Sequence, residues 1–301
     1  MNLLWRQCLL KAQRAFNGFD SMVKNGHRFD GSDYPAPIFI VGAPRTGSTL
    51  LFQTMLRQFK AAHISNLMAL APSQMIKIAI ICKRMGYLYT RGVKESTFGY
   101  VPGIQSPNEA GLIAETWFGR SLSETDTSRV RRTFNALSEI FYGPVVMKNM
   151  INSLRLKFVR SVLPECRFIY LKRNPLYTAQ SIILVRRKFL GDDALWWSTK
   201  PPGYETTLDH DPCYQVIWQV VSIEKIIEDA LKAVPELIYV IDYDEFRQNP
   251  ADTIDALATK FSIELRPDGL TDYVFIRSGN NIRLEADEWE KLEHYYGELS
   301  S

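Results

Sequence analysis

The segment GAPRTGST, residues 42–49, has the residue types of a turn that binds an anion. It follows the apolar run PIFIV, and its two glycines allow the backbone to approach a bound group closely. The residues after Gly47 open a helix, whose first N–H groups have no intrahelical acceptor and carry the positive end of the helix dipole. The sequence therefore predicts a phosphate cradle. Four side chains could add donors to it: Arg45, Thr46, Ser48 and Thr49.

The spacing of Gly42 and Gly47 matches a nucleoside-triphosphate P-loop, but Ser48 stands where that motif requires lysine. Without this lysine and a clear magnesium-binding partner, transfer of a γ-phosphate would lack its usual charge neutralisation. Arg45 supplies a cation inside the turn instead. The pattern argues against a P-loop phosphotransferase, which stays open as an alternative, as does a glycine-rich turn without a ligand.

A second candidate anion site lies in CRFIYLKRNPLYTAQS, residues 166–181. The segment reads as a strand, Arg173, a turn and a helix that carries Ser181. A guanidinium at a strand end and a hydroxyl in the next helix can converge on one phosphate through charge-assisted and directional hydrogen bonds. An exposed arginine and an ordinary helix serine are the alternative.

PRTGSTLL, residues 44–51, resembles the 5′-phosphosulfate loop of sulfotransferases that depend on 3′-phosphoadenosine 5′-phosphosulfate (PAPS). It is similar to the form of this loop in the tyrosylprotein and bacterial branches of the family. Arg173 and Ser181 resemble the 3′-phosphate site of the same family. The resemblance runs from about residue 37 to about residue 292, although its specific motifs occupy three short segments. The nucleotide-binding residues that it implies here are Arg45, Thr46, Gly47, Ser48, Thr49, Leu50, Arg173 and Ser181.

This resemblance implies an α/β sulfotransferase fold, with a P-loop-type central parallel sheet flanked by helices. It also implies a reaction in which an acceptor hydroxyl or amine attacks the sulfur of PAPS and adenosine 3′,5′-bisphosphate leaves, with no metal ion. Negative charge then grows on the sulfuryl and bridging oxygens, and Arg45 and Lys148 are the expected catalytic cations. Lys148 ends the strand that begins VVMK, at the sheet edge where α/β proteins bind ligands; a solvated lysine is the alternative.

Two further segments carry weaker resemblances. VFIRSGNN, residues 274–281, is similar to the 3′-phosphate RKG segment of cytosolic sulfotransferases, which makes Arg277 and Gly279 candidate phosphate contacts. Tyr243, in VIDYDEFRQNP, resembles a YEDL element that lies near the nucleotide. A surface turn and core packing are the respective alternatives.

The general base is the least determined part of the site. Asn66 stands where the tyrosylprotein branch has a glutamate after the P-loop helix. Glu109 in SPNEAGLIAE, similar to a PxE element of bacterial relatives, is the preferred base, and His63 is the second candidate. Glu109 could instead be a first-turn helix charge, and His63 a surface residue.

Apolar β-rich runs alternate with helical periodicity, which predicts one α/β domain over residues 37–301 after an N-terminal helical extension, residues 1–36. The expected strands are 38–41, 145–148, 167–171 and 237–241, and the clearest helices are 48–59, 154–162 and 214–234, the last ended by Pro235. An aromatic and proline-containing loop near residues 190–213 breaks this alternation and is the expected acceptor loop.

Composition limits the class of protein and its partners. With 301 residues, 46% of them hydrophobic, and a net charge of +3, the chain is expected to be globular, without nucleic acid as a partner. No apolar run reaches the roughly 20 residues of a membrane-spanning helix, although the N-terminal residues could form an amphipathic helix that touches a membrane surface. Four scattered cysteines suggest neither a zinc site nor a disulfide framework and fit a cytoplasmic setting. The oligomeric state is left open.

The acceptor is expected to be a hydroxyl of a carbohydrate or glycolipid, because several aromatic residues surround the long loop and no basic face suited to a polyanion is evident. They are Trp196, Trp197, Tyr204, Tyr214 and Trp218. A small lipophilic alcohol is the nearest alternative. A protein that binds the nucleotide without catalysis is a further one.

Overall fold

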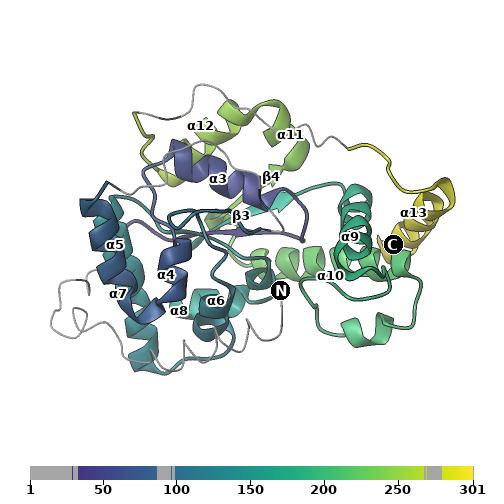
Figure 1. The fold of residues 1–301 in the computed structure, drawn as a ribbon, viewed down its shortest axis with the longest axis horizontal. Coiled ribbons are helices and arrows are strands. Elements are labelled where there is room, and N and C mark those ends of the chain that lie inside the picture. The colour runs from purple at the N-terminus through teal and green to yellow at the C-terminus, as the bar shows by residue number, and fades with distance from the viewer. Residues whose placement is uncertain are drawn as a thin grey trace.

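The computed structural model describes residues 29, 33–86, 96, 99–267, 269 and 280–300. Helices surround one central sheet (Figure 1). The strands are β1 (Ile38–Val41), β2 (Val146–Lys148), β3 (Arg167–Lys172) and β4 (Ile238–Asp242). The α-helices are α3 (Ser48–Gln58), α4 (Asn66–Leu70), α5 (Met75–Arg84), α6 (Gly111–Phe118), α7 (Glu124–Phe141), α8 (Leu156–Val162), α9 (Pro175–Leu190), α10 (Pro212–Leu231), α11 (Tyr243–Gln248), α12 (Pro250–Phe261) and α13 (Ala286–Ser300). Short 3-10 helices are η2 (Pro72–Gln74), η3 (Met150–Leu154), η4 (Tyr204–Thr207) and η5 (Pro235–Leu237).

The sheet is parallel, with strand order β2-β1-β3-β4. Ile40 of β1 lies opposite Lys148 on one side and Ile169 on the other. Because all four strands run in the same direction, their carboxyl ends meet at one edge of the sheet, where α/β folds bind ligands. The turn after β1 and the residues at the ends of β2 and β3 are therefore brought to the same edge.

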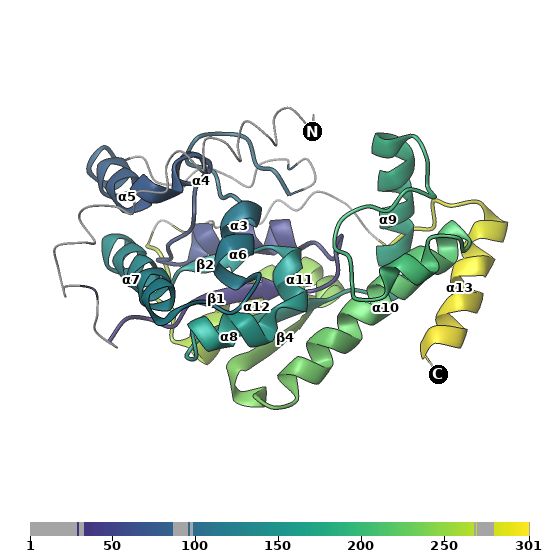
Figure 2. The ribbon, with the colours of Figure 1, turned by 90° about the horizontal axis from the view of Figure 1, so that it is seen from below.

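Alternation along β1 divides the core into two layers. Ile38 and Ile40 pack in a cluster with α3 and α12, whereas Phe39 and Val41 pack in a larger cluster with α6, α7, α8, α9 and α10. Successive side chains of a strand point to opposite faces, so a strand that is apolar throughout needs a cover on both. Figures 1 and 2 show α3, α11 and α12 on one face of the sheet and α8 and α10 on the other.

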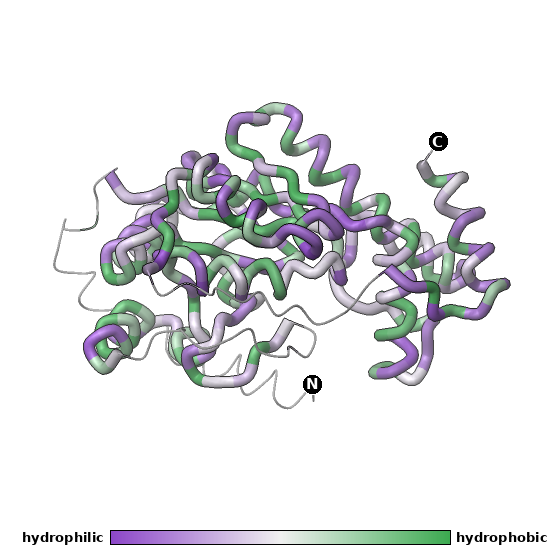
Figure 3. Tube along the Cα trace, turned by 90° about the horizontal axis from the view of Figure 1, so that it is seen from above, coloured by the Kyte–Doolittle hydropathy of each residue, from purple (hydrophilic) through white to green (hydrophobic). Residues whose placement is uncertain are grey.

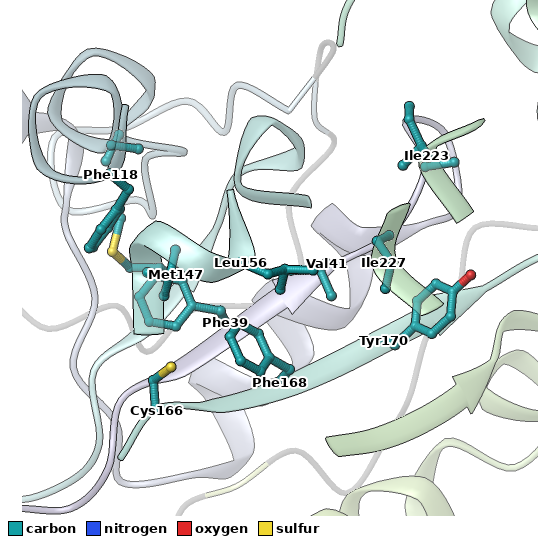
Figure 4. Close-up of a cluster of buried hydrophobic side chains, with 14 of the residues drawn as sticks. Phe39, Val41, Phe118, Met147, Leu156, Cys166, Phe168, Tyr170, Ile223 and Ile227 are labelled. Atoms are coloured by element: carbon teal, nitrogen blue, oxygen red, sulfur yellow. The ribbon is translucent and has the colours of Figure 1, made fainter. Parts of the chain in front are cut away.

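The larger cluster joins the sheet to α10. Figure 4 shows Phe39 and Phe168 from neighbouring strands beside Leu156, with Tyr170 close to Ile227 of α10. The hydropathy-coloured trace shows apolar residues along the central strands and mixed polar and apolar residues along α13 (Figure 3). Helices α9, α10 and α13 pack together and extend beyond the carboxyl edge of the sheet (Figure 2).

The predicted fold class is confirmed, and each expected strand agrees with the structure within one residue. Three helix boundaries were wrong by two residues or more, and one of them is the start of α10, which lies at Pro212 rather than at 214. The stretch before Leu156 forms the 3-10 helix η3, and α10 ends at Leu231 rather than at 234, because Pro235 disfavours helical backbone at the residue before it and opens η5. The expected extension, residues 1–36, lies almost wholly outside the described residues. Among the helices that are described, none has the length and apolar content needed to cross a membrane.

Candidate active site

The turn between β1 and α3 is built around two close backbone contacts. A Cβ atom on Gly42 would lie 2.7 Å from the carbonyl oxygen of Leu171, and one on Gly47 would lie 2.4 Å from the ring of Tyr243. Gly47 also has a left-handed backbone, with φ at 89°. Only glycine satisfies both demands at this position. Arg45 adopts a positive φ of 74° as well, a costly conformation that concentrates at functional turns.

The hydroxyls of the turn are directed to protein partners. Thr46 Oγ1 donates to the carbonyl of Ala43 over 3.0 Å, and Ser48 Oγ lies 3.6 Å from the sulfur of Met150. Both side chains are buried. The first N–H groups of α3 have no acceptor within the helix, so the backbone is the main donor that this turn offers an anion.

Ser153 braces the same turn and was not found from the sequence. The N–H of Gly42 donates to Ser153 Oγ over 3.0 Å, and that hydroxyl donates to the carbonyl of Gly42 over 2.9 Å. One buried side chain therefore satisfies both backbone groups of the first glycine. The only sequence signal was a hydroxyl residue five positions after Lys148.

Lys148 meets two other predicted residues at the carboxyl end of β2. Its ammonium forms an ion pair with Glu109 and donates to Thr49 Oγ1 over 3.0 Å. The lysine side chain is 4% exposed and the glutamate side chain 32% exposed. Glu109 lies just before α6 and not in its first turn, and Asn149 donates to its carbonyl over 3.1 Å. A buried cation is thus held beside a carboxylate that solvent can reach.

Asn66, where the resemblance to the tyrosylprotein branch led us to expect a glutamate, has a structural role. Its amide nitrogen donates to the carbonyls of Val101 and Gly103 over 2.8 and 2.7 Å, and its oxygen accepts from Asn108 over 2.7 Å. These contacts hold the segment that leads into Glu109. The asparagine thereby supports the loop that carries the alternative carboxylate.

His63 is half-buried next to that loop. Its Nε2 lies 3.0 Å from the carbonyl of Gln105, a partner to which only a protonated nitrogen can donate. Burial lowers the pKa of His63 to about 4, although the bond to Gln105 acts in the opposite direction. The imidazole is therefore neutral near pH 7, with its Nε2 proton committed to Gln105.

Arg45, Arg173, Ser181 and Tyr243 come together from four parts of the chain. Arg173 Nη1 donates to the carbonyl of Arg45 over 3.0 Å, and its guanidinium lies 4.7 Å from the centre of the Tyr243 ring. Arg45 Nε donates to Ser181 Oγ over 3.1 Å. The serine therefore contacts the arginine of the first loop, which links the two predicted anion sites.

A third guanidinium adds to this positive region. Burial lowers the pKa of Arg45, and the neighbouring charges of Arg173 and Arg283 lower it further. Burial is also the largest cause of the lowered pKa of Arg173. The repulsion among these cations favours binding of an anion, which would offset it. Arg283 was not identified from the sequence; its nearest signal was its place six residues after Arg277.

Asn280 and Gln180 attach the segment of Arg283 to the site. Asn280 Oδ1 accepts from Arg173 Nε and Nη2 over 3.1 and 2.9 Å. Gln180 Oε1 accepts from the N–H of Arg283 over 2.6 Å and of Leu284 over 3.2 Å. A phosphate at Arg173 would have to replace Asn280. The candidates Arg277 and Gly279 lie outside the described residues.

Comparisons with known proteins point to one family. A family model described as "Sulfotransferase family" matches residues 37–267. No curated protein matches the chain. Sulfotransferase STF9 from Mycobacterium avium is 14% identical, with a TM-score of 0.56 over 99% of this chain and 78% of that one. Sulfotransferase STF1 from Mycobacterium tuberculosis H37Rv is also 14% identical, with a TM-score of 0.53 over 95% of this chain and 81% of that one.

The two solved structures share the fold of this chain. At 14% identity, the similarity supports no conclusion about activity or substrate. Among the described residues, no group of three or more His, Cys, Asp or Glu side chains is placed to hold a metal ion. The family match covers all four strands of the described sheet together with the turn, Lys148 and Arg173. The chain therefore belongs to the sulfotransferase family, and it is a transferase.

Proposed function

We propose that this protein moves the sulfuryl group of PAPS to an acceptor hydroxyl on a neutral carbohydrate or glycolipid. The observation that carries the proposal is the pair of cationic centres at the carboxyl edge of the sheet. Lys148 forms one with Glu109 and Thr49. Arg45 and Arg173 form the other with Ser181.

The residues present fit the two ends of the donor. The backbone of residues 45–50 and the Arg45 side chain would hold the 5′-phosphosulfate, because a glycine-rich helix start binds anions. The 3′-phosphate would be held by Arg173, Ser181 and Arg283. Its negative charge would offset the repulsion among the arginines, and the serine hydroxyl would add a hydrogen bond. Tyr243 lies against both Gly47 and Arg173, so its ring would be next to both ends of the proposed donor.

The proposed reaction forms one bond to sulfur and breaks another. The acceptor oxygen attacks sulfur, the bond from sulfur to the 5′-phosphate oxygen breaks, and adenosine 3′,5′-bisphosphate leaves. Lys148 and Arg45 stabilise the charge that develops on the bridging and sulfuryl oxygens. Preorganised cations of this kind are worth several kcal/mol of barrier, and removal of one such donor costs about 100-fold to 1,000-fold.

Glu109 is the proposed general base for the acceptor proton. Its carboxylate is partly open to solvent and contacts the catalytic lysine directly. His63 is a weaker candidate, since burial lowers its pKa to about 4 and Nε2 is bound to a carbonyl. Asn66 supports this assignment indirectly through the contacts that position the Glu109 segment.

The acceptor class rests on the loop of residues 191–211. Trp196 lies 5.1 Å from Tyr204 and 6.4 Å from Trp218, measured between ring centres, which makes an aromatic cluster suited to a sugar ring or an apolar chain. The loop contains five acidic residues and one lysine, and this excess of negative charge disfavours anionic acceptors. The acidic residues are Asp192, Asp193, Glu205, Asp209 and Asp211. A small lipophilic alcohol is the second candidate.

We also propose a cytoplasmic location. The three cysteines that the structure describes, Cys82, Cys166 and Cys213, are free and buried. Free thiols persist in reducing compartments.

The test compares adenosine 3′,5′-bisphosphate with AMP by thermal shift. The bisphosphate should raise the melting temperature far more than AMP, and Arg173→Ala should abolish this preference, because Arg173 is proposed to bind the 3′-phosphate. Arg167→Ala, at the opposite end of the same strand, is the matched control and should keep it. Equal shifts with both nucleotides, or magnesium-dependent transfer from ATP, would refute the donor assignment. Acceptors would then be screened with labelled PAPS.

A further inference from the structure

The loop between α9 and α10, residues 191–211, is attached to its two helices from the inside. Three polar side chains beneath it are 0% exposed: Arg186 of α9, and Gln215 and Gln219 of α10. We call this set the polar clamp. Fully buried polar side chains of this size are uncommon, because each hydrogen bond left unmade is costly. Arg186 Nη1 and the Nε2 atoms of both glutamines have partners, whereas Arg186 Nε, Arg186 Nη2 and Gln219 Oε1 have none among the described residues.

The polar clamp binds backbone carbonyls along the whole loop. Arg186 Nη1 donates to the carbonyl of Asp193 over 3.0 Å and to Gln215 Oε1 over 2.8 Å. Gln215 Nε2 donates to two carbonyls at 3.1 Å, and Gln219 Nε2 to two at 3.0 and 2.7 Å. The carbonyls held by the two glutamines are those of Leu208, His210, Trp197 and Thr199.

These contacts fix the shape of the loop because their donors belong to side chains that are 0% exposed, and two of the bonds, Arg186 to Gln215 and Gln219 to Thr199, are fully buried. A buried donor or acceptor that loses its partner costs the full desolvation of that group, so loosening the loop would expose several such groups at once. Arg186 is the strictest case. Burial lowers the pKa of Arg186 to about 10, so it keeps its charge at neutral pH and requires these partners.

The ends of the loop are attached differently. Arg187 pairs with Asp193 and with Glu288 of α13, and Lys291 of α13 pairs with Asp211. These side chains are partly exposed, and ion pairs in contact with solvent contribute little to stability. The polar clamp is therefore the main attachment of the loop to α9 and α10.

The polar clamp also sets the aromatic cluster. The guanidinium of Arg186 lies 5.2 Å from the centre of the Trp196 ring, and Trp196 Nε1 donates to the carbonyl of Thr199 over 3.2 Å. Gln219 holds that same carbonyl. One network thus orients Trp196, which in turn contacts Tyr204 and Trp218.

We propose that Arg186, Gln215 and Gln219 are positioning residues that fold the acceptor loop before any acceptor arrives. The acceptor then meets a preformed aromatic surface and not a loop that folds around it. Preorganisation of this kind improves affinity because the ordering entropy of the loop has already been lost. The inference rests on the proposed function, because it assigns acceptor binding to this loop.

The first arm of the test measures hydrogen exchange in the wild-type protein and in Gln219→Leu. Four loop amides donate to carbonyls within the loop and report on its shape: Tyr204, Thr206, Leu208 and His210. Gln219→Leu removes two clamp bonds at similar volume and should speed their exchange at least tenfold. Ile227→Val, a buried change on the same helix that does not touch the loop, is the matched control and should leave them protected.

The second arm measures kinetics with octyl β-D-glucopyranoside as acceptor. Gln219→Leu should raise the KM for this acceptor at least fivefold, while the KM for PAPS and the Kd for adenosine 3′,5′-bisphosphate change less than twofold. Gln215→Met replaces Gln219→Leu if the latter does not fold. A merely structural defect would change the constants for both substrates together.

Each outcome decides between the two proposals. Unchanged loop exchange, or acceleration spread evenly over the chain, would overturn the polar clamp. A loosened loop with an unchanged acceptor KM would overturn its role in positioning the acceptor. A wild-type protein that binds adenosine 3′,5′-bisphosphate no better than AMP would refute the proposed donor. In that case the hydrogen-exchange data would still test whether the polar clamp fixes the shape of the loop.

Discussion

Lys148 holds its charge in an unusual position for a lysine, almost fully buried between Glu109 and Thr49. A lysine at this depth is retained where its charge is used or paired. The pairing with Glu109 places a cation and a carboxylate within contact at the end of one strand. In the proposed reaction the cation would stabilise the leaving group and the carboxylate would take the acceptor proton.

Lys148→Ala should lower kcat about 100-fold to 1,000-fold and change the KM for PAPS far less, because its charge is assigned to the transition state. Steady-state kinetics with labelled PAPS measure both constants. Lys172→Ala is the control, since Lys172 also ends a strand but pairs with Glu228 on α10. A loss confined to PAPS affinity would contradict the role.

Glu109→Gln should keep the fold and the affinity for adenosine 3′,5′-bisphosphate but depress transfer. The residual rate should recover at higher pH if ionisation of the acceptor replaces the base. His63→Ala should be milder, because the pKa of His63 is lowered to about 4 and its ring bonds to Gln105. A wild-type rate for Glu109→Gln across the pH range would make His63 the leading candidate.

At the scale of elements, the start of α3 connects β1, the helix and the proposed nucleotide site. The turn brings Gly42 against β3 and Gly47 against Tyr243, at the start of α11. Tyr243 in turn lies beside Arg173 at the end of β3. The two cationic centres therefore share one rigid support, and a change in the turn affects both.

Gly47→Ala should weaken binding of adenosine 3′,5′-bisphosphate at least tenfold and destabilise the fold by about 1–3 kcal/mol. The added Cβ would lie 2.4 Å from the Tyr243 ring and would force an alanine into a left-handed backbone. Calorimetry and urea unfolding measure the two effects. Gly191→Ala, also at positive φ but with open space around it, separates backbone strain from the clash. Equal effects of the two changes on nucleotide affinity would contradict this account.

At the scale of the whole molecule, the layer between the sheet and α10 contains a half-buried carboxyl group, that of Glu224. Burial raises the pKa of Glu224 to about 7, against the opposing charge of Lys172. Between about pH 4.5 and pH 7, Glu224 therefore binds a proton more often in the folded protein than in the unfolded chain. The contribution of Glu224 to stability is present in full below this window and is lost as the pH rises through it.

Glu224→Gln should remove that loss. Between pH 5 and pH 8 the wild-type protein should fall in stability relative to the variant by at most about 3 kcal/mol, as one pKa unit corresponds to ~1.4 kcal/mol. Urea unfolding at both pH values measures this. The lowered pKa of His63 acts in the opposite direction, but it acts equally in both proteins, so their difference isolates Glu224. Parallel pH profiles would contradict the prediction.

The sequence alone determined the parts of this protein that depend on neighbouring residues. Apolar runs located all four strands, because a strand covered on both faces must be apolar throughout. Glycines and an arginine at the end of the first run located the turn, and strand ends located Lys148 and Arg173 at the sheet edge. Such signals are local in the chain.

Only the tertiary structure decided which of these residues meet. Arg45 contacts Ser181, Ser153 braces Gly42, and Asn280 binds Arg173, each across more than 100 residues. The polar clamp beneath the proposed acceptor loop could not be predicted from the sequence either, because Gln215 and Gln219 look like ordinary polar residues of an amphipathic helix. Such contacts depend on how helices pack over the sheet, and no short stretch of sequence encodes that arrangement.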